Sequence, residues 1–481
     1  MQPFRTLERT IDSTERAIRS GDLATALAEI RAQFGDWLAL PSLTKNAIWG
    51  SRELDALAAR IGTIVSEQPA SHAAFALPER DEGRPLDVYL FTRTEVGGHV
   101  RVAGDFARAA PERSSAIVLA DQPGQYVAPF FAEHFATPLE RVVCLPALSL
   151  LERTRAVIAC LRALRPDRLF VLNHQDDVTV IAAAGARIVP ETYYVHAGDF
   201  LPALGVFMPG AVHLDLTPRA HTFCRSVLGI PSIFTPLVAE DRKRRPSAPV
   251  HSPPILATCG SPAKYDLTYR LPYHHVLAGL LANTSATFYH IGPLYDEQLA
   301  VIRTTLVDAG VAEDRWRHIP FVPSVWEALQ ELGVDLYVNS FPQRGARVAV
   351  EVMGSGTPAV WHVGEPLHQS VELHLAYPGA RAWTELHDLI AIVNDLDDEW
   401  VEHQGNAARS RYETAHHPAI LAGIVARDLG RQAMPIAPHE RLFSFEFQHL
   451  ERSWHRLTAL MAQDATSGGA APAGGEASGP A

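Results

Sequence analysis

Cysteine is scarce in this sequence. Only 4 of the 481 residues are cysteines, at Cys144, Cys160, Cys224 and Cys259, and no two of them form a C-x-x-C pair. This usage indicates neither a disulfide framework nor a zinc ribbon, and it fits a reducing cytoplasm, where thiols stay free.

Long apolar runs and an excess of positive charge are also missing. No apolar run approaches the ~20 residues of a membrane-spanning helix, so we expect no transmembrane segment. The stretch MQPFRTLERTIDSTERAIRS at the start carries charges throughout, so we expect no signal peptide. The formal net charge of −12 argues against broad nucleic-acid binding, which needs a basic surface. We therefore expect a cytoplasmic protein without a nucleic-acid partner.

The composition is that of a globular protein. Hydrophobic residues make up 47% of the chain and charged residues 20%. Because 481 residues are too many for one ordinary core, we expect two or three domains. Residues 1–80 are predicted to be helical, since three stretches place apolar residues three or four positions apart: ERTIDSTERAIRS, DLATALAEIRAQFGDWL and SRELDALAARIGTIVSE.

From residue 86 the pattern changes to short apolar strands that alternate with helices. Such continuous apolar strands predict a parallel sheet covered on both faces, here over residues 86–238. The strand segments are LDVYLFT, SSAIVLA, RVVCLPA, DRLFVLNH, ETYYVHA, AVHLDLTP and SIFTPLV. Residues 239–254 are charged and proline-rich, which is typical of a linker.

The alternation of strands and helices then starts again. The second unit is predicted over residues 254–430, with its sheet ending near residue 395. Its strand segments are ILATCGS, ATFYHIG, WRHIPFV, VDLYVNS, TPAVWH and GARAW. Residues 437–463 are predicted to form a C-terminal helix that packs back toward the first sheet unit. The tail at 466–481 is low in complexity and is predicted to be disordered.

Two such units imply a cleft, with chemistry in the loops that follow the strands. Gly97 and Gly98 separate the first strand from a helix; glycines there let a ligand approach the backbone, although a tight turn without a ligand explains them too. His196 ends a strand at the expected rim of the cleft. Three roles are open for it there: an acid or base, a partner for a sugar hydroxyl, or only the cap of a turn. His174 occupies a similar position.

The loops of the second unit carry the groups that suit a phosphate. Ser261 and Lys264 follow its first strand, although a lone loop lysine is usually solvated. After the strand VDLYVNS come Gln343, Arg344, Gly345, Ala346 and Arg347, at the start of a helix whose exposed N–H groups and dipole favour an anion. Glu351 lies one turn further along, within reach of the hydroxyl pair of a ribose.

These residues resemble the GT-B-fold glycosyltransferases, and among them the retaining family 4 group, whose donor domain bears E-x7-E and then Met-x-x-Gly-x-Pro. The matching stretch here is Gln343-x7-Glu351 followed by VMGSGTPAV. GGHVRVA resembles the glycine loop of that family, and YHIGP, with Gly292, and HIPFVPS resemble the segments that flank the nucleotide base. HAGDFLPALG resembles a histidine-bearing loop of some bacterial members. The resemblance covers residues 86 to about 430.

The resemblance implies an α/β, GT-B-like fold with an N-terminal helical appendage and a metal-independent transfer of sugar from a UDP- or GDP-sugar. The resemblance does not identify the acceptor, which it leaves open among a glycan, a lipid-linked glycan and a protein. Donor-binding roles fall to residues that the motifs match: Gly97, Gly98, Ser261, Lys264, Gly292, Arg344, Gly345, Ala346, Arg347 and Glu351. His196 and Gln343 take the catalytic positions beside the sugar, and no metal or cofactor is expected. Gln343 replaces the first glutamate of the motif, and an amide cannot stabilise positive charge.

Four other functions remain open. A nucleotide-sugar epimerase shares the double-Rossmann architecture, and the N-terminal helices suit an inverting protein glycosyltransferase similar to family 41. A binding protein that kept the cleft but lost turnover would account for Gln343. A zinc hydrolase is the weakest alternative, because neither H-x-x-x-H nor H-E-x-x-H occurs among the 22 histidines.

Overall fold

The computed structural model describes most of the chain. The described residues are 6–40, 48–69, 83–93, 98–121, 141–197, 201–244, 248–265, 269–364 and 375–426, together with residues 135, 267 and 429. The expected C-terminal helix at 437–463, the tail at 466–481 and Gly97 lie outside them. No helix in the described ranges is both long enough and apolar enough to span a bilayer.

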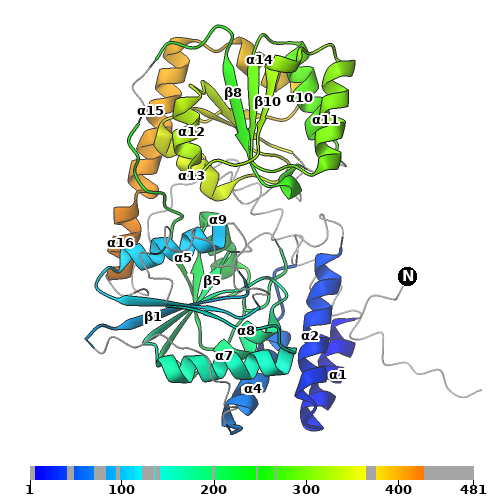
Figure 1. The fold of residues 1–481 in the computed structure, drawn as a ribbon, viewed down its shortest axis with the longest axis vertical. Coiled ribbons are helices and arrows are strands. Elements are labelled where there is room, and N and C mark those ends of the chain that lie inside the picture. Colours follow the sequence, from blue (N-terminus) through cyan, green and yellow to red (C-terminus); the bar gives the residue numbers. More distant parts are fainter. Residues whose placement is uncertain are drawn as a thin grey trace, which may run out of the picture.

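In the described part of the N-terminal region there are three helices, α1 (Leu7–Arg19), α2 (Leu23–Leu38) and α4 (Arg52–Glu67). Thr6, Asp22 and Ser51 cap their N-termini, each accepting a hydrogen bond from a first-turn N–H. The apolar faces of these helices share one core with a face of the first sheet, so they are packed onto that sheet unit. Figure 1 shows them, in blue, alongside α7 and α8.

The first sheet unit has seven parallel strands in the order β3-β2-β1-β4-β5-β6-β7. Its strands are β1 (Leu86–Phe91), β2 (Ser114–Leu119), β3 (Val142–Cys144), β4 (Arg168–Leu172), β5 (Glu191–His196), β6 (Val212–Asp215) and β7 (Ser232–Phe234). The helices between them are α5 (Gly98–Ala109), α7 (Leu150–Leu164), α8 (Val178–Gly185) and α9 (Pro218–Ser226). β1 is buried along its whole length, as expected for a strand covered on both faces.

The second sheet unit has six parallel strands in the order β10-β9-β8-β11-β12-β13. Its strands are β8 (Ile255–Cys259), β9 (Thr287–Ile291), β10 (Trp316–Ile319), β11 (Leu336–Val338), β12 (Ala359–His362) and β13 (Ala382–Trp383). The helical elements are η2 (Pro262–Lys264), α10 (Tyr273–Ala282), α11 (Asp296–Asp308), η3 (Glu313–Arg315), α12 (Val325–Glu331), α13 (Ala346–Ser355) and α14 (Leu386–Asn394). Every described strand of both units falls on a segment predicted from the sequence.

After the second sheet unit, two helices lead the chain back to the first unit. α15 (Asp398–Ala415) packs on α13 of the second unit, and α16 (Pro418–Ala426) packs on α5 of the first unit. Figure 1 shows both, in orange, along one side of the molecule. Arg409 of α15 pairs with Asp241 of the linker over 2.7 Å, and the Tyr412 hydroxyl donates to the Ala239 carbonyl. These two contacts hold the linker against α15.

Candidate functional site

The strand order reverses at one point in each sheet. In the first unit the reversal lies between β1 and β4, and in the second between β8 and β11. Loops that leave the carboxyl ends of two such strands diverge, which opens the crevice where α/β proteins bind ligands. Figure 1 shows α5 and α13, the helices that follow β1 and β11, at the facing ends of the two units. The candidate site is therefore built from these four loops.

Lys264 meets the start of α13 across the switch point of the second sheet. Its Nζ donates to the Arg344 carbonyl over 2.8 Å, and a β-carbon on Gly345 would lie 3.7 Å from the same Nζ. Asn339, directly after β11, accepts from the Gly345 N–H over 3.1 Å. Gly345 is the N-cap of α13, and no side-chain cap bonds its first turn within the described residues. An ammonium and uncapped N–H groups thus converge on one point, as an anion site requires.

Arg344 does not face this point. Its side chain is 3% exposed, and Nε donates to the His362 carbonyl at the end of β12 over 2.9 Å. The expectation that the Arg344 guanidinium binds the donor is thereby corrected, because the side chain is buried against the carboxyl end of β12. Burial, reinforced by this arginine, lowers the pKa of His362 to about 3. Gln343 lies in the same loop, half-buried, and its carbonyl accepts from the Ser340 hydroxyl.

Arg347 and Glu351 cross from α13 to α5. Arg347 forms an ion pair with Asp105, and Arg101 donates to Glu351 over 2.9 Å. Arg347 also lies 3.8 Å from Glu351, one turn along its own helix. The Glu351 side chain is only 7% exposed, so these are desolvated contacts between the two units. The predicted ribose-binding and phosphate-binding side chains are therefore brought together, and both already have ionic partners.

A cavity of about 290 Å³ lies beside this ion network. It is lined by residues of both units and of the linker, and it includes two residues of the predicted base-flanking segment HIPFVPS. The lining residues are Arg101, Arg108, Ala239, Glu240, Arg242, Pro323, Ser324, Trp326, Arg347 and Glu351. The four arginines of the lining are all in ion pairs, with the two glutamates of the lining and with Asp105 and Glu327 beside it.

The glycine loop of the first unit is described only from Gly98, which begins α5 and is exposed. A β-carbon there would meet no atom of the described residues within 4 Å, so packing does not require glycine. His99, in the first turn, lies with its ring 6.2 Å from that of His174, which follows β4. Burial, with a smaller contribution from His174, lowers the pKa of His99 to about 4. A neutral imidazole therefore stands at this switch point at pH 7.

Gly292 shapes the neighbouring loop of the second unit. Its φ is +113°, and a β-carbon would lie 2.4 Å from the Gly260 carbonyl oxygen. The His318 ring lies 2.8 Å from the Gly292 carbonyl. Gly292 thus lets the loop after β9 press against the loop after β8, where Ser261 is exposed and Lys264 half-buried. The close backbone approach is the physical reason for glycine here.

His196 is not at the rim of the cleft. Its side chain is fully buried, and Nδ1 lies 2.9 Å from Asp215 Oδ1. Along β5, Tyr193 and Val195 face the core that includes α5, whereas Tyr194 faces the core that includes the N-terminal helices. Because side chains alternate along a strand, His196 shares the face of Tyr194. The predicted contact of His196 with a donor or acceptor is corrected accordingly.

Asp215 sits at the centre of this buried group. Burial alone would raise the pKa of its carboxyl, but the imidazoles of His213 and His196 lower it below its usual value. Burial also lowers the pKa of His213. The carboxylate is therefore ionised at pH 7.

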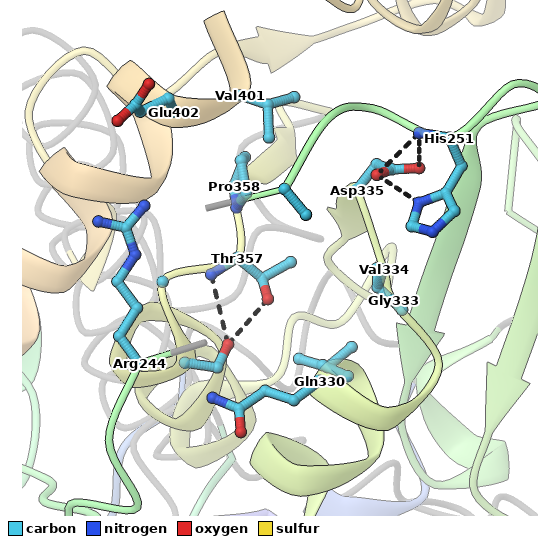
Figure 2. A pocket seen from close by; sticks show the side chains of 14 residues that line it. Arg244, His251, Gln330, Gly333, Val334, Asp335, Thr357, Pro358, Val401 and Glu402 are labelled. Atoms are coloured by element: carbon cyan, nitrogen blue, oxygen red, sulfur yellow. Dashed lines mark hydrogen bonds and ion pairs between the residues drawn. The ribbon is translucent and has the colours of Figure 1, made fainter. Parts of the chain in front are cut away.

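A second cavity, of about 60 Å³, lies at the amino ends of strands of the second sheet, opposite the candidate site, and is shown in Figure 2. Asp335, just before β11, accepts from the His251 Nδ1 over 2.9 Å and from the Ile255 N–H over 2.8 Å. Thr357, just before β12, lies 2.8 Å from the Ser355 hydroxyl. The contact of His251 anchors the linker to the amino end of β11. The cavity therefore lies at the amino ends of β11 and β12 and not among the carboxyl-end loops.

Two residues of the site did not figure in the sequence interpretation. Asn339 orients the N-terminus of α13, and Asp105 holds Arg347 from the other unit. A polar residue directly after the apolar strand LYV was a visible signal for Asn339. Asp105 lies one turn after Arg101 on the helix that follows the glycine loop, and this i, i+4 spacing puts both on one face.

No protein-family model matches the chain, and no curated protein matches its sequence. Solved structures do match its fold. HepE (Alr3699) of Anabaena, in complex with UDP and glucose, aligns with a TM-score of 0.55 and 16% identity over 72% of this chain and 100% of that one. A glycosyltransferase of Rickettsia africae ESF-5 aligns with a TM-score of 0.55 and 8% identity over 71% and 97%. At these identities the likeness shows the fold alone, and the predicted α/β, GT-B-like fold class is confirmed.

Proposed function

We propose that this chain is a glycosyltransferase that takes its sugar from a nucleotide-sugar donor held in the cleft. The observation that carries the proposal is the meeting of Lys264 with the uncapped start of α13 at the switch point of the second sheet. Similar folds support it: HepE has been solved with UDP, with UDP and glucose, and with UDP-glucose. A uridine or guanosine donor is the first choice.

Charge on the departing diphosphate decides which groups matter. As the bond between the sugar and the diphosphate breaks, negative charge grows on the phosphate oxygens. Hydrogen-bond donors and positive charges that are already in position stabilise this charge. Here Lys264, with Ala346 and Arg347 at the helix start, would supply that stabilisation without a metal at the diphosphate, while Gly345 would let the phosphates approach the backbone. Glu351 would accept from the ribose hydroxyls.

Gln343 would lie beside the transferred sugar, where its amide can bond hydroxyl groups. Retention of the anomeric configuration, as in the family 4 group, is part of the proposal. Gly98, and Gly97 before it, would border the sugar from the first unit. His196 has no part in the reaction, because it is buried away from the cleft. The proposal leaves the acceptor open among a glycan, a lipid-linked glycan and a protein. The four cysteines form no disulfide, which fits a cytoplasmic setting.

A thermal-shift screen with UDP-, GDP-, TDP- and CMP-sugars tests the donor. A ligand at 100 times its Kd adds about 2.7 kcal/mol to the stability of the native state. One nucleotide class should raise the melting temperature, and Lys264→Ala should remove most of that response. Lys243→Ala is the matched control, since this lysine is exposed on the linker. Equal responses of both variants, or no response to any nucleotide, would overturn the proposal.

Gln343 also favours a second candidate, a protein that binds the donor without turnover. Incubation with the donor and a panel of acceptors separates these alternatives. Transfer of sugar to an acceptor or to water supports the enzyme, and its anomeric product distinguishes retention from the inversion expected of a family-41-like enzyme. A new nucleotide sugar formed from the donor alone identifies an epimerase. Tight donor binding with neither product identifies a binding protein.

A further inference from the structure

Four buried side chains with metal-binding atoms meet in the first unit, away from the cleft. His196 ends β5, His213 and Asp215 lie in β6, and Cys224 lies in α9. His196 and Asp215 are register partners on parallel strands, and His213 is two residues before Asp215, so all three side chains share one face of the sheet. α9 then lays Cys224 over that face.

The six distances among the four ligand atoms outline a tetrahedron. The two histidine nitrogens are 3.2 Å apart, and they lie 2.9 and 3.0 Å from Asp215 Oδ1. Cys224 Sγ lies 3.7, 3.6 and 3.4 Å from His196 Nδ1, His213 Nε2 and Asp215 Oδ1. Tetrahedral zinc bonds of about 2.0–2.1 Å to nitrogen or oxygen and about 2.3 Å to sulfur give edges of about 3.3 and 3.6 Å.

Hydrogen bonds alone explain this arrangement poorly. Two imidazoles and a thiol all converge on Oδ1 of Asp215, which has only two lone pairs. The second oxygen, Oδ2, is buried and has no hydrogen-bond partner among the described residues; His221 Nδ1 lies 3.9 Å from it. A network built to satisfy a buried carboxylate would share its donors between both oxygens. A cation at the centre of the four atoms accounts for their convergence.

We propose that His196, His213, Asp215 and Cys224 bind one Zn²⁺ ion as a structural site. Two nitrogens, one oxygen and one sulfur in tetrahedral array are the donor set that zinc prefers. All four side chains are buried and the protein supplies every ligand, so no position is left for a substrate. The ion crosslinks β5, β6 and α9.

The surroundings of the cluster hold its ligands in place. His213 hydrogen-bonds the backbone of Val206, which fixes its ring so that Nε2 faces the cluster. The Trp49 ring packs edge-on against the His196 ring at 5.5 Å. Asp55 of α4 accepts from the Gly205 and Phe207 N–H groups, on either side of Val206. The zinc site is thus joined to the N-terminal helices through one segment of backbone.

Metal content and cobalt substitution test the site in the full chain. Protein purified without chelator should contain about one zinc per chain, and chelation should lower its melting temperature by about 5 °C or more. Co²⁺ added to the chelated protein should produce the visible absorption of a tetrahedral cobalt–thiolate centre. Zn²⁺ should restore the melting temperature.

Cysteine variants show whether these residues hold the ion. Cys224→Ser should lose the cobalt–thiolate absorption and at least ten-fold in zinc affinity. Cys160→Ser is the matched control, since Cys160 is equally buried but outside the cluster, and it should behave as the unaltered chain. If Cys224→Ser does not fold, the cobalt spectrum of the unaltered chain still decides. Absence of zinc after purification, together with no response of the chelated protein to Zn²⁺ or Co²⁺, would overturn the proposal.

Discussion

Arg101 of the first unit donates to Glu351 of the second over 2.9 Å, although 250 positions separate them in the sequence. This ion pair bridges α5 and α13, the two helices that border the candidate cleft. Both ion pairs of Glu351 in the described part of the chain use Oε1, so Oε2 is the oxygen that a ribose hydroxyl would reach. This carboxylate therefore joins the two units, and under the proposed function it would also bind the ribose.

Glu351→Ala should weaken nucleotide binding by about 1.5–3 kcal/mol, the range for a hydrogen bond to a charged group. The loss should be similar for the nucleoside, the nucleoside diphosphate and the nucleotide sugar, because all three carry the ribose. Calorimetry with the three ligands measures it.

Arg101→Ala is the control for the Glu351 prediction, because it breaks the same ion pair and keeps the carboxylate. We expect it to weaken nucleoside binding much less than Glu351→Ala does. If the two variants lose affinity equally for every ligand, Glu351 acts only by joining the units. If Glu351→Ala binds nucleotides normally while remaining folded, the assignment of the donor site is wrong.

Arg347→Ala should discriminate between ligands by their phosphates. Its guanidinium pairs with Asp105, and a diphosphate that displaced this carboxylate would gain a charge-assisted bond. We expect affinity for the nucleoside diphosphate to fall about ten-fold or more, while affinity for the nucleoside changes little. Asp105→Asn keeps the shape of the partner and frees the arginine, so it should not weaken diphosphate binding. A parallel loss in both variants would mean that the pair serves only to hold the units together.

Gly292→Ala should destabilise the protein and weaken donor binding together. The added β-carbon would lie 2.4 Å from the Gly260 carbonyl oxygen, and moving that loop displaces the neighbourhood of Lys264. Gly310→Ala isolates the backbone strain, because Gly310 also has a positive φ, +68°, but no described atom lies within 4 Å of the added carbon. We expect Gly310→Ala to cost about 1–2 kcal/mol without affecting affinity. Melting temperature and donor affinity of both variants check this, and equal effects would contradict it.

Acid should destabilise the second unit through His290. This histidine is fully buried, with Nδ1 2.9 Å from the Tyr273 hydroxyl, and burial lowers its pKa to about 3. The unfolded chain, with a histidine pKa of about 6.5, binds a proton that the folded chain refuses, so stability is lost as the pH falls below about 6.5.

The loss through His290 reaches at most about 1.4 kcal/mol per pH unit for this one group. His290→Gln keeps an acceptor for Tyr273 and should flatten the fall of the unfolding midpoint between about pH 6.5 and pH 4. His387→Gln is the control, because the His387 side chain is 80% exposed. An unchanged pH dependence in His290→Gln would contradict the prediction.

Several features of the molecule follow from the sequence alone. Apolar runs such as LDVYLF and VDLYV predict strands because a parallel strand buried on both faces must be apolar throughout. The alternation with helices then requires two parallel sheets, and it puts Lys264 and the 343–347 segment in loops at the carboxyl ends of strands. That Lys264 and Gly345 are neighbours follows once the strand order is known, since β8 and β11 are adjacent.

The direction of individual side chains was decided only by the tertiary structure. Arg344 and Arg347 are equivalent in the sequence pattern, yet one is buried against β12 and the other reaches Asp105 on a different unit. His196 ends a strand, as predicted, but the face it occupies is covered by α9 and the N-terminal helices. Local periodicity specifies elements, whereas these contacts depend on which element packs over which.

The His196 cluster shows the same division. No metal was predicted from the sequence, because the four proposed zinc ligands are spaced 17, 2 and 9 residues apart and form no local motif. Strand register sets His196 beside Asp215, the two-residue repeat adds His213, and the docking of α9 adds Cys224. A metal motif on one helix or turn is visible in sequence because backbone geometry fixes its spacing; this site depends on the pairing of two strands and the packing of a helix, which only the folded chain decides.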